Sequence, residues 1–229
     1  MTQVVTNAIV LSRTNYQEAD RIITFLTSDN GKVRGLAKGV RRSRAKLAGG
    51  IEPLSINEIG FIKGRSELCT LTSARLQQHF GNIVSNMDRT MRAYALLKRI
   101  NSVTEDNSGN EYFELASQTL KALDDPETDM LLIELWFDSQ LLDISGHTPN
   151  LTHDRKDTPL KAGTRYMFDL ESMIFDEHPE GNFSSTHIKL LRLVRTHSLV
   201  SLERISGIED FVQPCLQLVS TMRKNYLHV

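Results

Sequence analysis

The first 80 residues consist of short apolar runs separated by polar turns, which is typical of β-strands rather than helices. Five such runs, of which the first is rich in β-branched side chains, predict strands at residues 4–11, 20–27, 32–38, 54–62 and 66–74. Between the second and third runs lies Asn30-Gly31, which is a strong hairpin signal when apolar runs flank it. Five short strands in about 75 residues predict a small barrel that is closed or nearly closed.

After Phe80 the apolar positions recur every three to four residues, which predicts amphipathic helices at residues 87–100 and 111–123. Residues 127–144 are apolar nearly all round, so we expect this helix in the middle of a bundle. Asp125 followed by Pro126 predicts its N-terminus.

Helical patterns return at residues 185–194 and 199–205 and in a last helix that begins near residue 210. Ser185 and Asp210 are the expected N-caps. Pro214 is expected in the first turn of the last helix, where a missing amide donor costs little.

The segment 146–181 is polar and irregular, and it predicts one short hairpin from residues 165–170 and 172–176. Four side chains in this segment could ligate a divalent ion: His147, His153, Asp154 and Asp157. A metal-dependent hydrolase is therefore one alternative hypothesis for the function. No compact ligand spacing such as C-x-x-C is present, and we favour a solvated polar turn.

The composition is that of an ordinary globular chain, with 229 residues, 40% hydrophobic and 24% charged. No apolar stretch approaches the roughly 20 residues that span a bilayer, and residues 1–11 do not resemble a secretion signal. Cys69 and Cys215 are far apart, so we expect a reducing cytoplasm and two buried thiols. The motifs of phosphate loops, serine hydrolases and zinc proteases are missing from the sequence, so we expect no enzyme.

The charges are unevenly distributed along the chain. Residues 1–80 hold twelve Lys/Arg against six Asp/Glu, a net charge of +6, whereas residues 81–229 carry −7. Seven cations without an acid among them stand between residues 32 and 46, namely Lys32, Arg34, Lys38, Arg41, Arg42, Arg44 and Lys46. Cations at this density on one barrel edge favour binding of nucleic-acid phosphates.

Single-strand binding by small barrels also uses aromatic rings that stack on bases. Phe25 and Phe61 lie within predicted strands and are expected in the core. Tyr16 lies in the predicted loop 12–19 and is the only candidate for an exposed stacking ring. We therefore expect binding that is driven by phosphates and has a weak sequence preference.

The basic segment contains AKGVRR at 37–42, and it follows AIVL at 8–11, EADR at 18–21, LT at 26–27 and GK at 31–32. In this order these stretches resemble the RecO family of bacterial recombination mediator and DNA repair proteins. The resemblance continues more weakly through EPL at 52–54 and the strand ending at Ala74. Beyond residue 80 it consists mainly of element order, with Leu141-Leu142, Gly146, Pro149 and Leu151.

The resemblance implies an α+β protein with an OB-fold DNA-binding domain at 1–80 and an α-helical domain at 81–229, with an insertion at about 146–181. It implies binding to single- and double-stranded DNA, annealing of complementary strands and loading of a recombinase onto DNA coated by single-strand-binding protein. The implied partners are RecR, in some lineages RecF, and the C-terminal tail of single-strand-binding protein, with no cofactor and no membrane. The implied location is the cytoplasm, in association with the nucleoid.

Many members of this family carry paired C-x-x-C elements in the insertion, and this chain has Asp154 and Asp157 at the first pair. No cysteine stands between residues 172 and 181, so we expect no zinc site. The insertion should instead be held by packing of Tyr166, Phe168, Ile174 and Phe175.

Two further hypotheses concern partners. An RNA-binding OB-fold module is the alternative among binding proteins, and a preference for 2′-hydroxyl groups would distinguish it. For an acidic tail peptide we expect a small apolar pocket with cations on its rim. The candidates are Arg92, Lys98, Arg99, Lys189, Arg192 and Arg195.

Overall fold

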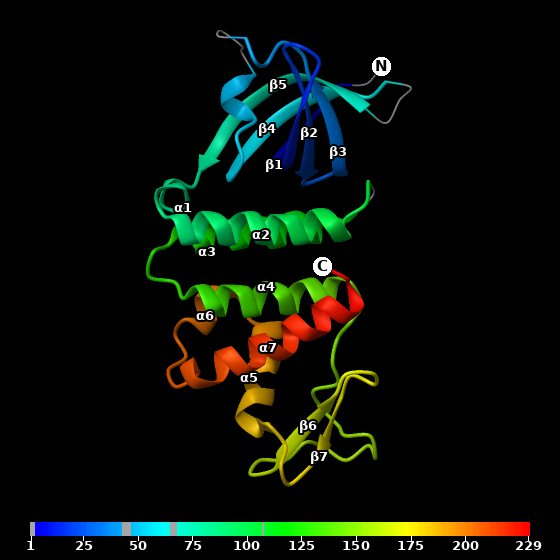
Figure 1. Ribbon diagram of the computed structural model, residues 1–229, viewed down its shortest axis with the longest axis vertical. Helices are drawn as coiled ribbons and strands as arrows, with labels where there is room; N and C mark the ends of the chain where they lie inside the picture. Colours follow the sequence, from blue (N-terminus) through cyan, green and yellow to red (C-terminus); the bar gives the residue numbers. More distant parts are fainter. Residues whose placement is uncertain (1–2, 43–46, 65–67, 107) are drawn as a thin grey trace. The chain divides into compact units, whose positions relative to one another are not determined.

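The computed structural model describes residues 3–42, 47–64, 68–106 and 108–229. The chain divides into two compact units, Met1–Pro126 and Glu127–Val229. The first unit contains the barrel together with three helices, and the second contains the remaining helices and a small sheet (Figure 1). The expected division into a DNA-binding domain at 1–80 and a helical domain at 81–229 stays a prediction.

Five strands form a closed barrel in the order β1-β2-β3-β5-β4. They are β1 (Gln3–Tyr16), β2 (Asp20–Thr27), β3 (Gly31–Ala37), β4 (Ser55–Ile62) and β5 (Leu68–His79). β1 pairs with both β2 and β4, and β3 pairs in parallel with β5, which closes the cylinder. A short 3₁₀ helix, η1 (Ala48–Gly50), precedes β4. The predicted five-stranded OB-fold barrel is confirmed.

Alternation along the strands separates the barrel interior from its outer surface. In β3, Val33 and Ala37 are buried in the core, whereas Arg34 between them is exposed. Phe25 and Phe61 are fully buried core residues, as the sequence predicts. Ile9 and Leu26 pair with each other and are also fully buried, although they alternate with the core residues. Their burial is consistent with helix α3 (Asn110–Asp124), which contacts β1 and β2.

Two strands are longer than the apolar runs indicate. β1 continues past a bulge between Val10 and Ser12 and ends at Tyr16, so Tyr16 lies on a strand and not in the predicted loop 12–19. β5 continues past Ala74 to His79. Both extensions consist mostly of exposed residues, so cross-strand pairing sustains them without a buried apolar row.

The helices of the first unit are α1 (Gly81–Ser85), which the sequence did not predict, α2 (Met87–Val103) and α3. Arg89 on α2 is buried, and its guanidinium donates hydrogen bonds to the carbonyls of Leu123 at 3.0 Å and Pro126 at 2.7 Å. Because these contacts fix the turn after α3, Asp125-Pro126 ends one helix and does not begin the next. The next helix is capped by Asp129, whose carboxylate accepts from the Leu132 amide at 2.8 Å.

The second unit is built around α4 (Met130–Ile144), which contacts α5 (Ser185–Thr196), α6 (Leu199–Leu202) and α7 (Glu209–Tyr226). Most of α4 is buried, which confirms its predicted central position. A buried ion pair links α4 to α7, with Arg223 Nε 2.9 Å from Asp138 Oδ2. Removing one partner of such a pair leaves a buried charge uncompensated, at a cost of about 3–5 kcal/mol.

Two predicted helix starts in this unit are shifted. Ser184, not Ser185, is the N-cap of α5, and its amide donates to His187 Nδ1 at 3.0 Å. α7 begins at Glu209, so Asp210 lies within the first turn and is not the cap. Pro214 therefore lies inside the helix beyond the first turn, where a proline removes one intrahelical amide donor.

The insertion forms a three-stranded sheet in the order β7-β6-β8. Its strands are β6 (Arg165–Asp169), β7 (Ile174–Glu177) and β8 (Phe183–Ser184), so the predicted hairpin is confirmed and one strand was missed. Tyr166 and Phe175 are buried, and the Phe175 ring lies 4.7 Å from that of Phe168 and 5.5 Å from that of Phe183. Across the described residues, none of the helices combines the length and the apolar character that a membrane crossing requires.

Candidate nucleic-acid interface

The basic turn that follows β3, residues 38–42, is attached to the turn between β1 and β2. The Gly39 amide donates to Asp20 Oδ1 at 2.7 Å, and the Arg41 amide donates to the Ala19 carbonyl at 3.0 Å. Gly39 has φ +65°, a left-handed conformation that favours glycine. The conformation of this basic turn is therefore fixed by the Asp20 carboxylate and the Ala19 carbonyl.

Four of the predicted DNA-binding cations lie on this edge of the barrel. Lys38, Arg41 and Arg42 are exposed in the basic turn, and Arg34 is exposed on the outer face of β3. The Arg41 guanidinium donates to the Glu18 carbonyl at 3.2 Å, which leaves its positive charge without a carboxylate in that contact. Cations held close together by a fixed backbone can meet several phosphates of one strand.

Lys32 has a different environment from the other cations. Its Nζ donates to the Asn101 carbonyl at 2.8 Å, in the last turn of α2. Burial lowers the pKa of Lys32, and the charges of Asp106 and Glu105 oppose that shift. A cation at a helix C-terminus interacts favourably with the helix dipole, so this position has a structural explanation.

Arg44 and Lys46, the last two of the seven predicted cations, lie outside the described residues. The next described residue, Leu47, packs against the barrel core.

The outer faces of β2 and β3 form the surface between these cations. Arg34 pairs with Thr24, and the half-buried Leu36 pairs with Ile22. Tyr16 pairs with Asp20 at the end of the β1–β2 hairpin, and 41% of its surface is exposed. Tyr16, the predicted stacking ring, therefore lies opposite Asp20, whose carboxylate accepts the hydrogen bond from the Gly39 amide. In OB-folds this strand face and its adjoining loops are where oligonucleotides bind.

Sequence reasoning gave Asp20 no role, although Asp20 belongs to the EADR stretch that carries part of the family resemblance. The structure makes it the anchor of the basic turn. The local sequence around Asp20 does not indicate that it anchors the turn, because its hydrogen-bond donor is a backbone amide nineteen residues away.

The residues of the hydrolase hypothesis do not form a shared ligand set. His147 stacks on Tyr226 with 5.1 Å between ring centroids, and His153 Nδ1 lies 3.0 Å from the Thr152 hydroxyl. Asp154 Oδ1 accepts from two amides of its own turn, and these hydrogen bonds lower the pKa of Asp154. Over the described part of the chain, no three His, Cys, Asp or Glu side chains gather as a metal site would require.

The six cations predicted to rim an acidic-tail pocket are distributed over both units. Arg92, Lys98 and Arg99 lie on α2, and Arg195 forms an ion pair with Asp143 at 3.0 Å. Lys189 and Arg192 on α5, together with Lys161, line a small cavity of about 40 Å³ whose apolar side chains include Leu160 and Ile188. We call this the cationic pocket.

Known proteins resemble this chain over both units. A family model described as "Recombination protein O N terminal" matches residues 1–80. A protein of Alkaliphilus metalliredigens named DNA repair protein RecO is 32% identical over 148 residues, which are 64% of this chain and 60% of the relative. A protein of the same name from Dehalococcoides mccartyi is 33% identical over 147 residues, which are 64% of this chain and 57% of the relative.

A longer match extends over most of the second unit. A protein of Syntrophobacter fumaroxidans, also named DNA repair protein RecO, is 30% identical over 207 residues, which are 87% of this chain and 82% of the relative. The first two matches, in contrast, span only about three fifths of each relative's length.

Proposed function

Because the chain belongs to the RecO family, we propose that it is a DNA-binding protein of recombinational repair that catalyses no reaction of its own. The observation that carries this proposal is the basic turn 38–42, which hydrogen bonds from Gly39 and Arg41 attach to the barrel. Its cations lie beside the β2–β3 face that OB-folds use for oligonucleotides.

The proposed site consists of the basic turn, Arg34 and Tyr16. The cations contact phosphates, which supplies affinity without sequence preference. The exposed ring of Tyr16 stacks on one base, which favours single strands because their bases are accessible. Double-stranded DNA binds through the phosphates alone, and therefore more weakly. No group of this site reads base edges, so a weak sequence preference is expected.

The proposed activity is annealing of complementary strands. Cations reduce the repulsion between two phosphate backbones, and a protein that holds both strands raises their local concentration. On DNA coated by single-strand-binding protein, the same chain would assist loading of a recombinase, with RecR as partner and, in some lineages, RecF. These finer steps rest on the family relationship and on the charge of the barrel.

The acidic tail of single-strand-binding protein is proposed to occupy the cationic pocket in the second unit. Lys161 and Lys189 offer charge to its carboxylates, and the half-buried Leu160 offers apolar surface beside these cations. Two of the six cations suggested by the sequence, Lys189 and Arg192, line this pocket.

The decisive experiment measures annealing of complementary oligonucleotides, bare and coated with single-strand-binding protein, at several salt concentrations. We expect annealing that weakens steeply with salt, and DNA that competes better than RNA of the same sequence. Absence of annealing at low salt would contradict the proposed activity. Stronger competition by RNA would assign the barrel to RNA instead.

A further inference from the structure

The second unit contains another cavity, formed by the N-terminus of α4, by α6 and by the start of α7. Its volume is about 220 Å³. The apolar lining comes from Leu131, Leu132, Leu202, Ile205, Ile208 and Val212. A cavity of this size is smaller than the roughly 300–1,000 Å³ of typical small-molecule sites, and it suits one or two aliphatic side chains.

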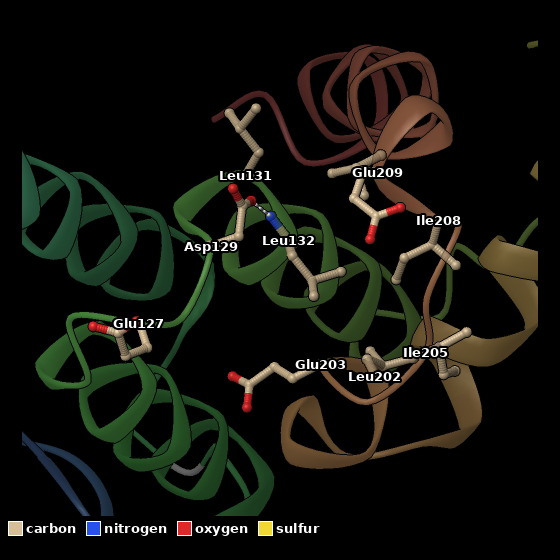
Figure 2. Close-up of a pocket in the computed structure, with 10 residues that line it drawn as sticks. Glu127, Asp129, Leu131, Leu132, Leu202, Glu203, Ile205, Ile208 and Glu209 are labelled. Atoms are coloured by element: carbon tan, nitrogen blue, oxygen red, sulfur yellow. Dashed lines mark hydrogen bonds between the residues drawn. The ribbon is translucent and has the colours of Figure 1, made fainter.

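All four charged side chains that line this cavity are acidic, and we call it the acidic pocket. They are Glu127, Asp129, Glu203 and Glu209. In Figure 2, Leu132 lies between the carboxylates of Glu203 and Glu209, which come from different elements. The apolar lining is thus bordered by negative charge on more than one side.

Part of this rim is held in place by the fold. The hydroxyl of Thr128, which is buried, donates to Glu203 Oε1 at 2.7 Å. Asp129 is the N-cap of α4 and accepts from the Leu132 amide. Leu131, which also lines the pocket, is 37% exposed. Fixed acceptors around exposed apolar surface are the usual elements of a peptide-binding site.

The charge of the pocket decides what it can bind. Nucleic acid and acidic tail peptides carry the same sign as its rim and are repelled, whereas Lys and Arg side chains are attracted. The field of the unit acts in the same direction, because residues 127–229 hold ten Lys/Arg against fifteen Asp/Glu. A divalent ion is not supported, since no metal-like cluster occurs among the residues that the structure describes.

We propose that the acidic pocket binds a short segment of a partner protein in which Lys or Arg residues flank one or two aliphatic side chains. The aliphatic side chains enter between Leu132, Ile205 and Ile208, and the cations pair with Glu203 and Glu209. This site is independent of DNA binding, because it uses neither the basic turn nor the β2–β3 face. The cationic pocket of the same unit has the opposite rim, so the two pockets select opposite partners.

The test is a titration of the full chain with fluorescent peptides, followed by anisotropy. One peptide alternates leucine with lysine, a second has glutamate for each lysine, and a third has serine for each leucine. We expect the first peptide to bind the acidic pocket and the third to bind at least tenfold more weakly. The double variant Glu203→Gln/Glu209→Gln should weaken binding of the first peptide about fivefold, since each removed charge contributes modestly to affinity at an exposed rim.

Glutamine at 203 can still accept the Thr128 hydrogen bond, so the variant changes charge with little change in shape. The matched control is Glu171→Gln/Glu180→Gln, which makes the same charge change at exposed positions away from the pocket. If both double variants weakened peptide binding equally, the proposal would be overturned, because the loss of affinity would then come from the change in net charge alone. Equal binding of the serine peptide would also overturn it.

Self-association is the other occupant that the test must detect. Sedimentation of the wild-type chain and of Glu203→Gln/Glu209→Gln is compared under the same conditions. A dimer that is lost in this variant but kept in the control would assign the pocket to a second copy, contrary to the proposal. Unchanged sedimentation together with weaker peptide binding supports it.

Discussion

Asp20 at the start of β2 accepts a hydrogen bond from the backbone amide of Gly39 at 2.7 Å, and this contact connects an acid to the most basic turn of the described barrel. A carboxylate beside a phosphate-binding surface lowers its positive potential. Asp20 therefore has two opposite effects on DNA binding, one through its charge and one through the turn that it holds.

These two effects can be separated by substitution. Asp20→Asn keeps an acceptor for the Gly39 amide and removes the charge, so single-stranded DNA should bind about two- to threefold more tightly. Asp20→Ala removes charge and acceptor together, so the turn loses its anchor and binding should weaken despite the lost acid. The measurement is anisotropy with a labelled oligonucleotide. Tighter binding by both variants would show that the anchor has no influence on the site.

The charges of the turn should appear in the salt dependence of binding. If about four phosphates are neutralised, log K against log salt should have a slope near −3, at roughly −0.7 per phosphate for single strands. Arg41→Ala/Arg42→Ala should reduce this slope by about 1.4 and leave thermal stability nearly unchanged. The control Lys98→Ala/Lys121→Ala removes the same charge from α2 and α3. An unchanged slope in the arginine variant would exclude the basic turn.

Stacking on Tyr16 predicts a preference for single strands. Tyr16→Ala should weaken binding of single-stranded DNA by about 1–3 kcal/mol, the usual cost of losing one stacked base, and should affect binding of duplex DNA much less. Tyr16→Phe keeps the ring and should bind like the wild type. Equal losses on both forms of DNA in Tyr16→Ala would indicate a structural role for this residue.

Lys32 and Arg34 should differ although both lie on β3. Lys32→Ala removes the contact with the Asn101 carbonyl at the end of α2 and should lower the free energy of unfolding by about 1 kcal/mol. Arg34→Ala changes an exposed residue and should cost less than about 0.5 kcal/mol while weakening DNA binding. Urea denaturation and DNA titration of both variants test this contrast. If only Lys32→Ala impaired DNA binding, Lys32 and not Arg34 would be the DNA-binding residue of β3.

Cys215 should make stability depend on alkaline pH. Burial raises its pKa to about 12 from an ordinary value of 9.0, so the unfolded chain releases the thiol proton at lower pH than the folded chain. The stability contributed by the neutral thiol is complete below pH 9 and is lost as the pH rises toward 12. Cys215→Ala should flatten this part of the curve of unfolding free energy against pH. A curve unchanged by the substitution would contradict the assignment.

Several features of this protein followed from the sequence because they depend on local pattern. Short apolar runs with an Asn30-Gly31 turn predicted the barrel strands, and the apolar character of α4 predicted its burial. The sequence stretches that resembled the RecO family lie in the strands and turns of this barrel, and the family model matches the same residues, 1–80. The concentration of cations between residues 32 and 46 was likewise visible from composition alone.

Other features depended on partners that are distant in the chain. Whether Lys32 faces solvent or a carbonyl is decided by Asn101, whose position depends on how α2 packs against the barrel. Asp20 anchors the basic turn because β2 pairs with β3, which places Arg21 opposite Ala37. Asp129 caps α4 because the fold begins that helix at Met130. The acidic pocket combines side chains from three helices, so its charge and shape exist only after those helices pack. Sequence pattern specifies which face of an element is apolar, and tertiary packing decides which polar groups then meet.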